Sequence, residues 1–474
     1  MRFSVLVLFL TCFFLPGYSQ SQTLQRPAAR WIKADQDIRT AITRYDVPGA
    51  SIMVIEHGRI VWTHAYGKRD IQHNLAVQMD THFEIGSITK QFTAVSILQL
   101  RDAGKLKLDD PLSVYLPDAP HAKEVTLRNL LTHTSGLHDY LDGPPAEIDR
   151  LAALPISYHD LLSRVAAMPL DFPPGSQWSY SNTGYLLLGK VIEVVSGEPY
   201  RDYIQQRILN PLGMRNTFTT ADESHLPNMA IGYRHENGVQ AIAPFIDPSW
   251  GSSAGFLIST PEDLSRWDAA LHGGKVVSPA SYREMTTAFM TTKNGSADYG
   301  FGLFVDSMYG QPRVGHTGGA QGFTAADEYF PEQDTRIIAL TNSGDKTPEA
   351  GETLTNIVFA DLYPSIAANA LKPATEENSL VTQAAGAAFR ELQTGANYMH
   401  FSSRLKDKFA HGSGEKFKTS LSPYGPASAA IFRHTRLEGG YQWYDYLILF
   451  GPGVSIPFSV RMDQDGVVAG FSIG

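Results

Sequence analysis

Cysteine is almost absent from this sequence of 474 residues, which contains only Cys12. Because Cys12 lies in an apolar stretch at the start of the chain, we expect the rest to form no disulfide and to offer no thiolate nucleophile or zinc ligand. The histidines include no His-x-x-x-His pair on a predicted helix with a catalytic glutamate, and His133 and His138 are expected to be structural. The sequence therefore predicts no metal site and no other cofactor.

Basic runs and long apolar runs are missing too. The chain has 39 lysines and arginines against 48 acidic residues, a formal charge of -9, so nucleic acid and anionic membrane surfaces are poor partners. Beyond the first residues, no apolar stretch is long enough to cross a bilayer. We therefore expect a small-molecule or peptide substrate as the partner, no nucleic acid, and no transmembrane segment in the mature chain.

The start of the chain has the pattern of an export signal. Arg2 precedes an apolar run over residues 3–15, which is too short to span a bilayer as an anchor. Small residues near its end suit cleavage after residue 19. We predict a signal peptide at 1–19 and a polar linker at 20–30, and hence an exported protein that is periplasmic or secreted.

The order of strand and helix patterns predicts two domains. A chain of 474 residues exceeds the size of a single hydrophobic core. A hairpin pattern at 50–65, with its turn at residues 57–58, and strand patterns after residue 322 flank a largely helical middle, so both ends of one domain are expected to complete one sheet. We predict an α+β fold, with a sheet flanked by helices and an inserted helical subdomain at 31–370. Helical patterns at 380–391 and 397–409, followed by strand patterns at 427–436, 441–450, 454–462 and 467–473, predict a small α+β domain at 371–474.

A serine followed three residues later by lysine begins at Ser87, Ser343, Ser403 and Ser413, and the surroundings separate the four. Ser343 and Ser413 lie in glycine-rich turns, and Ser403 lies on a charged helix face. Ser87 follows a glycine and opens a long apolar helix pattern. On a helix, Ser87 and Lys90 share one face, so a lysine of lowered pKa could accept the serine proton. An N-cap serine beside a surface lysine would give the same pattern.

Two further motifs could complete a site with this serine. The tripeptide 180–182 (Tyr-Ser-Asn) lies in a polar segment just before an apolar helix pattern, although a turn with the asparagine as helix cap would look similar. The tetrapeptide 316–319 (His-Thr-Gly-Gly) lies near the start of the strand-rich C-terminal part. Its glycines would let a substrate approach a strand edge closely, and a simple turn is the alternative.

Together the three motifs resemble those of the serine β-lactamases and penicillin-binding proteins. Tyrosine as the first residue of the middle motif makes the chain most similar to the class C branch, with family VIII esterases, D-aminopeptidases and D-Ala-D-Ala carboxypeptidases as relatives. The phrase at 130–137 (Leu-Leu-Thr-His-Thr-Ser-Gly-Leu) is similar to the family as well. The resemblance covers residue 31 to about residue 365. It implies a β-lactamase-like fold and hydrolysis through an acyl-serine intermediate.

The resemblance also implies a role for each motif residue. Ser87 would be acylated, Lys90 would accept its proton, and Tyr180 would pass protons to the leaving group. Asn182 would hold the amide or acyl side of the substrate. The backbone N–H groups of Ser87 and Gly319 would form the oxyanion hole, with Gly318 and His316 beside them.

His316 stands where β-lactamases and carboxypeptidases usually carry lysine. A lysine offers a permanent cation to a substrate carboxylate, whereas a histidine near its ordinary pKa of about 6.5 is mostly neutral at pH 7. We therefore expect a broad esterase or D-amino-acid peptidase whose His316 becomes cationic below about pH 6.5. A β-lactamase, a D-Ala-D-Ala carboxypeptidase and a non-catalytic protein that binds or senses peptidoglycan are the alternatives.

Ser253 is a second candidate nucleophile, because residues 251–255 fit the Gly-x-Ser-x-Gly pattern of α/β-hydrolases. That pattern requires a strand before the serine and a helix directly after it. Pro244 and Pro248 interrupt the approach, and the residues at 256–258 have a strand pattern. We predict that Ser253 is not the nucleophile.

Overall fold

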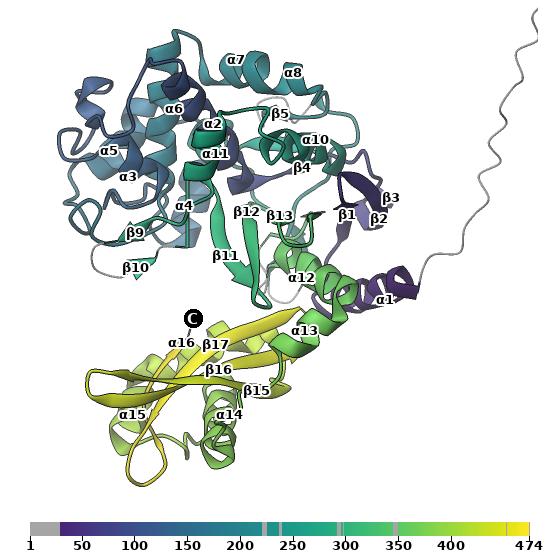
Figure 1. Ribbon diagram of the computed structural model, residues 1–474, viewed down its shortest axis with the longest axis vertical. Helices are drawn as coiled ribbons and strands as arrows, with labels where there is room; N and C mark the ends of the chain where they lie inside the picture. Colours follow the sequence, from purple (N-terminus) through teal and green to yellow (C-terminus); the bar gives the residue numbers. More distant parts are fainter. Residues whose placement is uncertain are drawn as a thin grey trace, which may run out of the picture.

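The fold is described from a computed structural model of residues 29–219, 225–236, 239–291, 295–296, 298–344, 349–451 and 453–473. The predicted signal peptide and most of the predicted linker lie outside these residues. Figure 1 shows a large unit that combines a sheet with many helices, and a smaller unit formed by the C-terminal part of the chain. The predicted α+β class is confirmed for both units. None of the described helices is both long and apolar enough to cross a bilayer.

A seven-stranded antiparallel sheet of order β11-β12-β13-β14-β1-β2-β3 forms the centre of the large unit. Three strands come early in the chain and four come late: β1 (Gly49–Glu56), β2 (Arg59–Asp70), β3 (Leu75–Ala76), β11 (Phe304–Met308), β12 (Gln311–Ala320), β13 (Phe323–Phe330) and β14 (Thr335–Thr341). In β1, Ile52 lies opposite His64 of β2 and Ala339 of β14. The prediction that both ends of the unit complete one sheet is confirmed.

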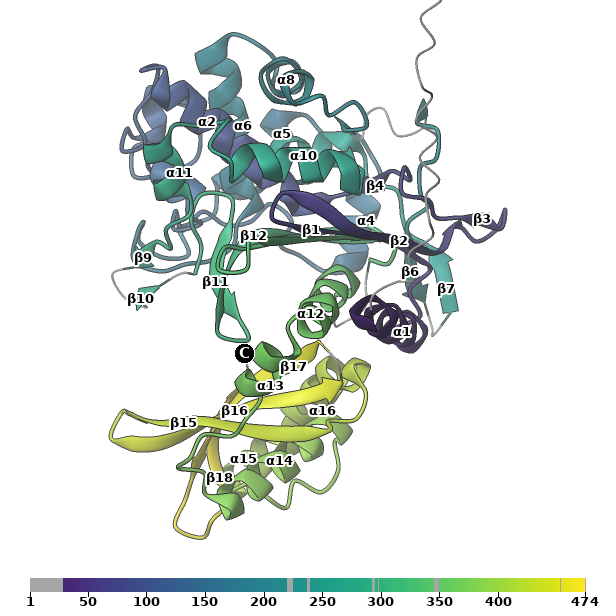
Figure 2. The same ribbon diagram turned by 45° about the vertical axis from the view of Figure 1, so that its right-hand side comes forward.

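Both faces of the central strands are buried. In β1, Ile52 and Val54 belong to one core with the helices α1 (Ala29–Arg44) and α12 (Ala350–Leu362), whereas Met53 belongs to a second core on the opposite face. Figure 2 shows the sheet almost edge-on, with α2 and α10 on one side and α1 and α12 on the other. Strands covered on both faces are apolar at successive positions, which explains the nearly continuous apolar sequence of β1.

Helices dominate the chain between β3 and β11. They are α2 (Thr89–Asp102), α3 (Leu127–Leu131), α4 (Pro145–Ala152), α5 (Tyr158–Ala166), α6 (Asn182–Ser196), α7 (Tyr200–Ile204), α8 (Asn210–Leu212), α9 (Ser252–Gly255), α10 (Pro261–Leu271) and α11 (Pro279–Met285). The small strands of this part are β4 (Phe83–Glu84), β5 (Phe218–Thr219), β6 (Tyr233–Glu236), β7 (Val239–Ile242), β8 (Leu257–Ser259), β9 (Met290–Thr291) and β10 (Gly295–Ser296). Helix α2 packs against α6 and α9 at the centre, as the predicted inserted helical subdomain requires.

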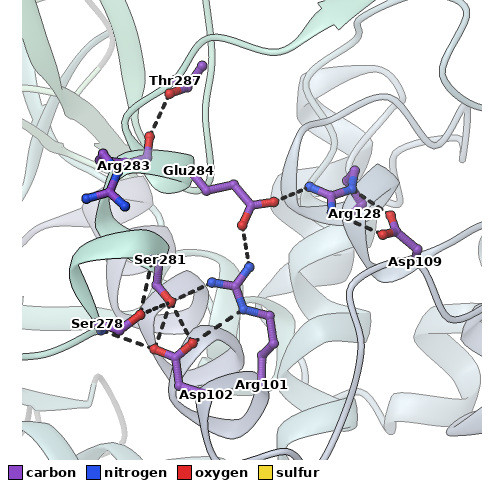
Figure 3. Close-up of polar contacts among 9 residues, drawn as sticks. All are labelled: Arg101, Asp102, Asp109, Arg128, Ser278, Ser281, Arg283, Glu284 and Thr287. Carbon is purple, nitrogen blue, oxygen red and sulfur yellow. Dashed lines mark hydrogen bonds and ion pairs between the residues drawn. The ribbon is translucent and has the colours of Figure 1, made fainter.

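A network of ion pairs holds the C-terminal end of α2 (Figure 3). Glu284 of α11 accepts hydrogen bonds from Arg101 of α2 and from Arg128 of α3. Asp102 of α2 accepts a 2.6 Å hydrogen bond from the hydroxyl of Ser281 in α11. Half-exposed ion pairs each contribute little to stability, but together these contacts connect three helices. They fix the far end of the helix whose first turn carries Lys90.

The C-terminal unit is a four-stranded antiparallel sheet, β15-β16-β17-β18, packed against helices. Its elements are β15 (Ala429–Glu438), β16 (Tyr441–Gly451), β17 (Val454–Met462), β18 (Val468–Ile473), α14 (Ser379–Thr394), α15 (Ser403–Lys408) and α16 (Gly414–Leu421), and α13 (Pro364–Ala370) connects it to the large unit. Asn356 of α12 donates a 3.1 Å hydrogen bond to Gly453 O, so the two units are in contact. The domain boundary at residue 371 stays a prediction.

One predicted helix begins later than its pattern suggested. The sequence favoured a helix over 397–409, whereas α15 begins at Ser403. Asn397 and Tyr398 have φ values of 54° and 47°, in the left-handed region. A right-handed helix cannot pass through such residues, so apolar spacing alone placed its start too early.

Candidate active site

Ser87 lies in a single 3-10 turn, Gly86–Ile88, directly before α2. Gly86 has a φ of +49°, and a Cβ atom there would lie 2.6 Å from Gly319 O. Only glycine tolerates both the conformation and the contact. The predicted glycine break before the helix therefore has a specific purpose, since it lets the turn that carries Ser87 touch strand β12.

Lys90 is fully buried one helical turn after Ser87. Its Nζ lies 3.0 Å from Ser87 Oγ, 2.8 Å from Asn182 Oδ1 and 2.7 Å from Ala254 O. The amide and peptide oxygens can only accept hydrogen bonds. A neutral lysine would therefore donate its two hydrogens to Asn182 and Ala254, and its lone pair would point at the hydroxyl of Ser87.

Burial lowers the pKa of Lys90 from 10.5 to about 7, although the nearby carboxylate of Asp139 acts in the opposite direction. A pKa near neutrality means that a large share of the molecules carries an uncharged amine at pH 7. The geometry and the lowered pKa together make Lys90 suitable as a general base for Ser87. The alternative of a surface lysine beside an N-cap serine is wrong, because Lys90 is not exposed.

Tyr180 lies at the end of the loop before α6, close to Ser87. Burial raises its pKa well above 10, and the Ser87 hydroxyl partly offsets this effect. The phenol is therefore protonated near neutral pH and can give up a proton rather than take one. Among the described residues, the buried phenol oxygen of Tyr180 has no hydrogen-bond partner of normal geometry. The Nζ of Lys90 lies 4.7 Å from the centre of the Tyr180 ring.

Asn182 is oriented by Asp139, a residue that the sequence analysis did not select. Oδ2 of Asp139 accepts hydrogen bonds from the backbone N–H of Asn182 and, at 3.1 Å, from its side-chain Nδ2. The Asn182 Oδ1 is thereby turned toward Lys90. Ser181, rather than Asn182, caps α6, so the alternative with Asn182 as helix cap is wrong. Asp139 lies two residues after the family-like phrase at 130–137, and this position in the sequence could have identified it as a candidate.

His316 is buried in β12, with 2% of its surface exposed. Its Nδ1 lies 2.5 Å from Thr317 O, which can only accept, so Nδ1 carries the proton; Nε2 lies 2.9 Å from the Tyr299 hydroxyl and accepts from it. Burial, with a contribution from Lys90, lowers the pKa of His316 from 6.5 to about 3. The expectation that His316 becomes cationic below about pH 6.5 is therefore wrong, because its surroundings favour the neutral ring.

Gly318 and Gly319 form the edge of β12 that faces Ser87. Strand β11 pairs with residues 311–315 of β12 and stops there, which leaves this side of 316–320 to the turn before α2. A Cβ atom on Gly318 would lie 2.0 Å from Ile85 O, so a side chain would force the strand and the turn apart. The two glycines thus bring the Gly319 backbone beside Ser87, as an oxyanion hole requires.

A cavity of about 330 Å³ opens at Ser87 and Gly319. Its wall is largely apolar and aromatic, with Tyr140, Leu141, Ile148, Ile246, Trp250 and Phe256 among the lining residues. No lysine or arginine belongs to the described part of this lining. The cavity is therefore suited to an uncharged group rather than to a carboxylate.

His133 supports the site from behind. Its ring lies 4.3 Å from the Tyr180 ring, centre to centre, and its Nδ1 accepts a 3.1 Å hydrogen bond from Ser181 N. Burial lowers its pKa well below 6.5, so the ring is neutral and positions the loop that carries Tyr180. Among the described residues, no group of three or more histidine, cysteine or acidic side chains is arranged to hold a metal ion.

Ser253 is placed differently from Ser87. It lies in the short helix α9 without a strand directly before it, is 1% exposed, and donates a 3.0 Å hydrogen bond to Tyr185 O. The remaining Ser-x-x-Lys pairs give no comparable site. Ser403 and Ser413 lie in the C-terminal unit, and Lys346, the partner of Ser343, lies outside the described residues.

Comparisons with known proteins give the same assignment for fold and family. A family model described as β-lactamase matches residues 30–362. PbpX of Bacillus subtilis (strain 168), whose name assigns it to the penicillin-binding proteins, is 33% identical over 291 residues, which cover 61% of this chain and 69% of PbpX. The structure of a D-stereospecific amidohydrolase from a Streptomyces species is 30% identical, with a TM-score of 0.58 over 66% of this chain and 95% of that chain.

One solved structure resembles nearly the whole chain. The octameric penicillin-binding protein homologue from Pyrococcus abyssi aligns with 94% of this chain and 99% of its own, at 23% identity and a TM-score of 0.64. At this identity the match concerns the fold alone. It extends the resemblance beyond residue 362, where the family model stops, into the C-terminal unit.

Proposed function

The chain belongs to the β-lactamase family of serine hydrolases, and from that premise we propose that it hydrolyses esters and amides that carry no carboxylate near the reacting bond, through an acyl-Ser87 intermediate. The observation that carries the proposal is Lys90 Nζ, buried at 3.0 Å from Ser87 Oγ with its other two partners restricted to accepting. The N-terminal sequence pattern supports export, so the reaction would take place in the periplasm or outside the cell.

In the proposed reaction, neutral Lys90 takes the proton of Ser87 while Oγ attacks the substrate carbonyl. The backbone N–H groups of Ser87 and Gly319 hold the oxygen that becomes negative. Tyr180 donates its proton to the departing alcohol or amine and is reprotonated from the Lys90 ammonium. Water then attacks the acyl carbonyl while neutral Lys90 takes one of its protons, and this proton passes to Ser87 Oγ as the acyl bond breaks, which releases the acid and restores Ser87.

The neutral state of His316 and the apolar cavity wall favour substrates without a carboxylate near the reacting bond. This argues for esters and amides over β-lactams and D-Ala-D-Ala peptides, whose carboxylate would need a cation. Amides of D-amino acids are the amide class we propose, because the Streptomyces relative is named a D-stereospecific amidohydrolase. A silent binding protein is disfavoured, because a binding protein has no need of a buried lysine beside a serine.

The test is a substrate panel on the purified mature protein and on Ser87→Ala. The panel contains short acyl esters, D- and L-amino-acid amides and a chromogenic cephalosporin. We expect turnover of esters and D-amides, weak turnover of the cephalosporin, and an acyl adduct on Ser87 in mass spectra of a quenched reaction. Faster turnover of the cephalosporin than of every ester and amide would contradict the substrate assignment. An adduct on another residue would contradict the mechanism.

A further inference from the structure

A second cavity of about 400 Å³ lies behind α9 and is not needed by the proposed reaction. Its lining includes Ile156, Leu161 and Leu186 from α6 and the region of α5, together with Ser253. The charged groups in the lining are Lys190 and Glu193, which pair with each other at 2.7 Å and are partly exposed, and Arg201, which is exposed. Most of the remaining lining is apolar, so the cavity offers apolar surface rather than a site for an ion.

Residues 251–256 separate this cavity from the one at Ser87. Gly251, Ala254 and Gly255 line the Ser87 cavity, whereas Ser252 and Ser253 line the second. The backbone of this wall is fixed to α2, because Lys90 Nζ donates to Ala254 O at 2.7 Å and Thr93 Oγ1 donates to Ser253 O at 2.7 Å. The wall backbone therefore cannot move without disturbing the base of the proposed reaction.

Phe256 lines both cavities and is only half-buried. Its ring packs against Gly251, where an added Cβ atom would lie 2.6 Å from the ring. The ring thus occupies the place where a side chain would otherwise fill the wall. The backbone on either side of Phe256 is held, because Ala254 O accepts from Lys90 Nζ and Leu257 N donates a 3.1 Å hydrogen bond to Thr89 Oγ1. The side chain of Phe256 is therefore the part of this wall that a substitution can shorten without moving the backbone.

We infer that Phe256 determines the length of acyl chain that the protein accepts, and that the cavity behind α9 is an acyl subsite closed by its ring. The inference rests on the proposed function and names the part of the substrate that meets this wall. With Phe256 present, a linear acyl chain bound at Ser87 fills the first cavity and ends at the ring. With a small residue there, a longer chain would extend into the second cavity and bury further methylene groups.

The experiment measures kcat/KM for p-nitrophenyl acetate, butyrate, octanoate and dodecanoate with wild type, Phe256→Leu and Phe256→Ala. For wild type we expect the rate to stop rising once the chain reaches the ring. For Phe256→Ala we expect a gain of about fourfold for each further methylene group that becomes buried. Phe256→Leu should lie between the two, and thermal unfolding checks that both variants fold.

Ile156→Trp supplies the matched control, because Ile156 lines only the second cavity and is half-buried. By itself this substitution should leave the chain-length profile of wild type unchanged. In Phe256→Ala it should remove the gain for octanoate and dodecanoate, because the indole would fill the added space.

Each contrary outcome has a distinct meaning. An unchanged profile in folded Phe256→Ala, or a gain that persists in the double variant, would overturn the inference and leave the proposed function in place. Absence of turnover of every ester by wild type would overturn the proposed function and this inference with it.

Discussion

Ser87 and Ser253 both lie in short helical segments that contact α2, and their surroundings give them different chemistry. The Ser87 oxygen lies between a buried amine and an open cavity. The Ser253 hydroxyl donates its hydrogen bond to the carbonyl of Tyr185. The carbonyls of Ser253 and Ala254 accept hydrogen bonds from α2, and none of these contacts supplies a base to the Ser253 hydroxyl. A serine becomes a nucleophile through the group opposite its oxygen, and a sequence pattern around it is not sufficient.

Removal of Ser87 should give the largest difference in activity between the two serines. Ser87→Ala should lower kcat/KM by roughly four to six orders of magnitude, because the nucleophile of the proposed reaction is lost. The measurement is hydrolysis of the best ester of the panel, together with covalent labelling followed by mass spectrometry. Residual activity within about tenfold of wild type would show that another group attacks the substrate.

His316→Lys tests the charge of the strand beside Ser87. A lysine there would add a cation that can pair with a substrate carboxylate, so kcat/KM for carboxylate-bearing esters should rise about tenfold to a hundredfold relative to neutral esters. Because the pKa of wild-type His316 is lowered to about 3, the wild-type ring is neutral at about pH 5.5 and about pH 8, either side of the ordinary histidine pKa. Burial would lower the pKa of the introduced lysine as it lowers that of Lys90, so the gain should be larger at about pH 5.5.

The matched control for this substitution is His316→Gln, which changes the side chain without adding charge. It should leave the preference between the two kinds of ester unchanged. An equal ratio for His316→Lys and wild type at both pH values would mean that this position does not influence the charged end of a substrate.

The pH dependence of kcat/KM tests whether Lys90 is the base that distinguishes Ser87 from Ser253. Only neutral Lys90 can accept the Ser87 proton, so kcat/KM should fall as pH falls through about 7, the lowered pKa of Lys90. The Asp139 carboxylate stabilises the ammonium, so Asp139→Asn should lower the pKa further and move this acid limb to lower pH. The plateau should fall by no more than about tenfold, because the two hydrogen bonds that Asn182 donates to this side chain are weakened but not both lost.

Asp142→Asn is the control for Asp139, since it removes an exposed carboxylate from the same loop. Its acid limb should match that of wild type. Movement of the limb to higher pH in Asp139→Asn would contradict the assignment of Lys90 as the base, because loss of a nearby anion cannot favour the ammonium.

The smallest effect is expected for the second serine. Ser253→Ala should leave kcat/KM within about threefold of wild type. It should lower the free energy of unfolding by about 1 kcal/mol, because the hydrogen bond to Tyr185 O is lost in a buried place. Urea unfolding and the ester assay measure the two quantities. Loss of activity comparable to that of Ser87→Ala, in a folded protein, would reverse the roles of the two serines.

Local spacing was sufficient to find the elements around the site. The pattern of Ser87 followed by Lys90 on a helix, the hairpin of β1 and β2, and the four strands of the C-terminal unit depend on residues close together in sequence. The structure has all of them, with the helix at Ser87 preceded by one 3-10 turn. The start of α15 was placed too early, because two left-handed residues left no trace in the apolar pattern.

Contacts between residues outside the motifs could not be predicted from the sequence patterns. Asp139, Tyr299 and His133 surround the site without belonging to any of the three motifs. Each acts through a group far along the chain, as Asp139 does through Asn182 and Tyr299 does through His316. The expected pKa of His316, about 6.5, was too high for the same reason, because burial rather than residue type sets it.

The sequence by itself determined the family, the order of strands and helices, and the serine and lysine that share one helix face, because these depend on periodicity and on motifs of a few residues. Only the tertiary structure decided that Lys90 has a pKa near 7, that His316 stays neutral, and that Phe256 lines two cavities. These properties arise from desolvation and from partners such as Ala254, which lies 164 positions from Lys90. Burial of that kind exists only after the chain has folded.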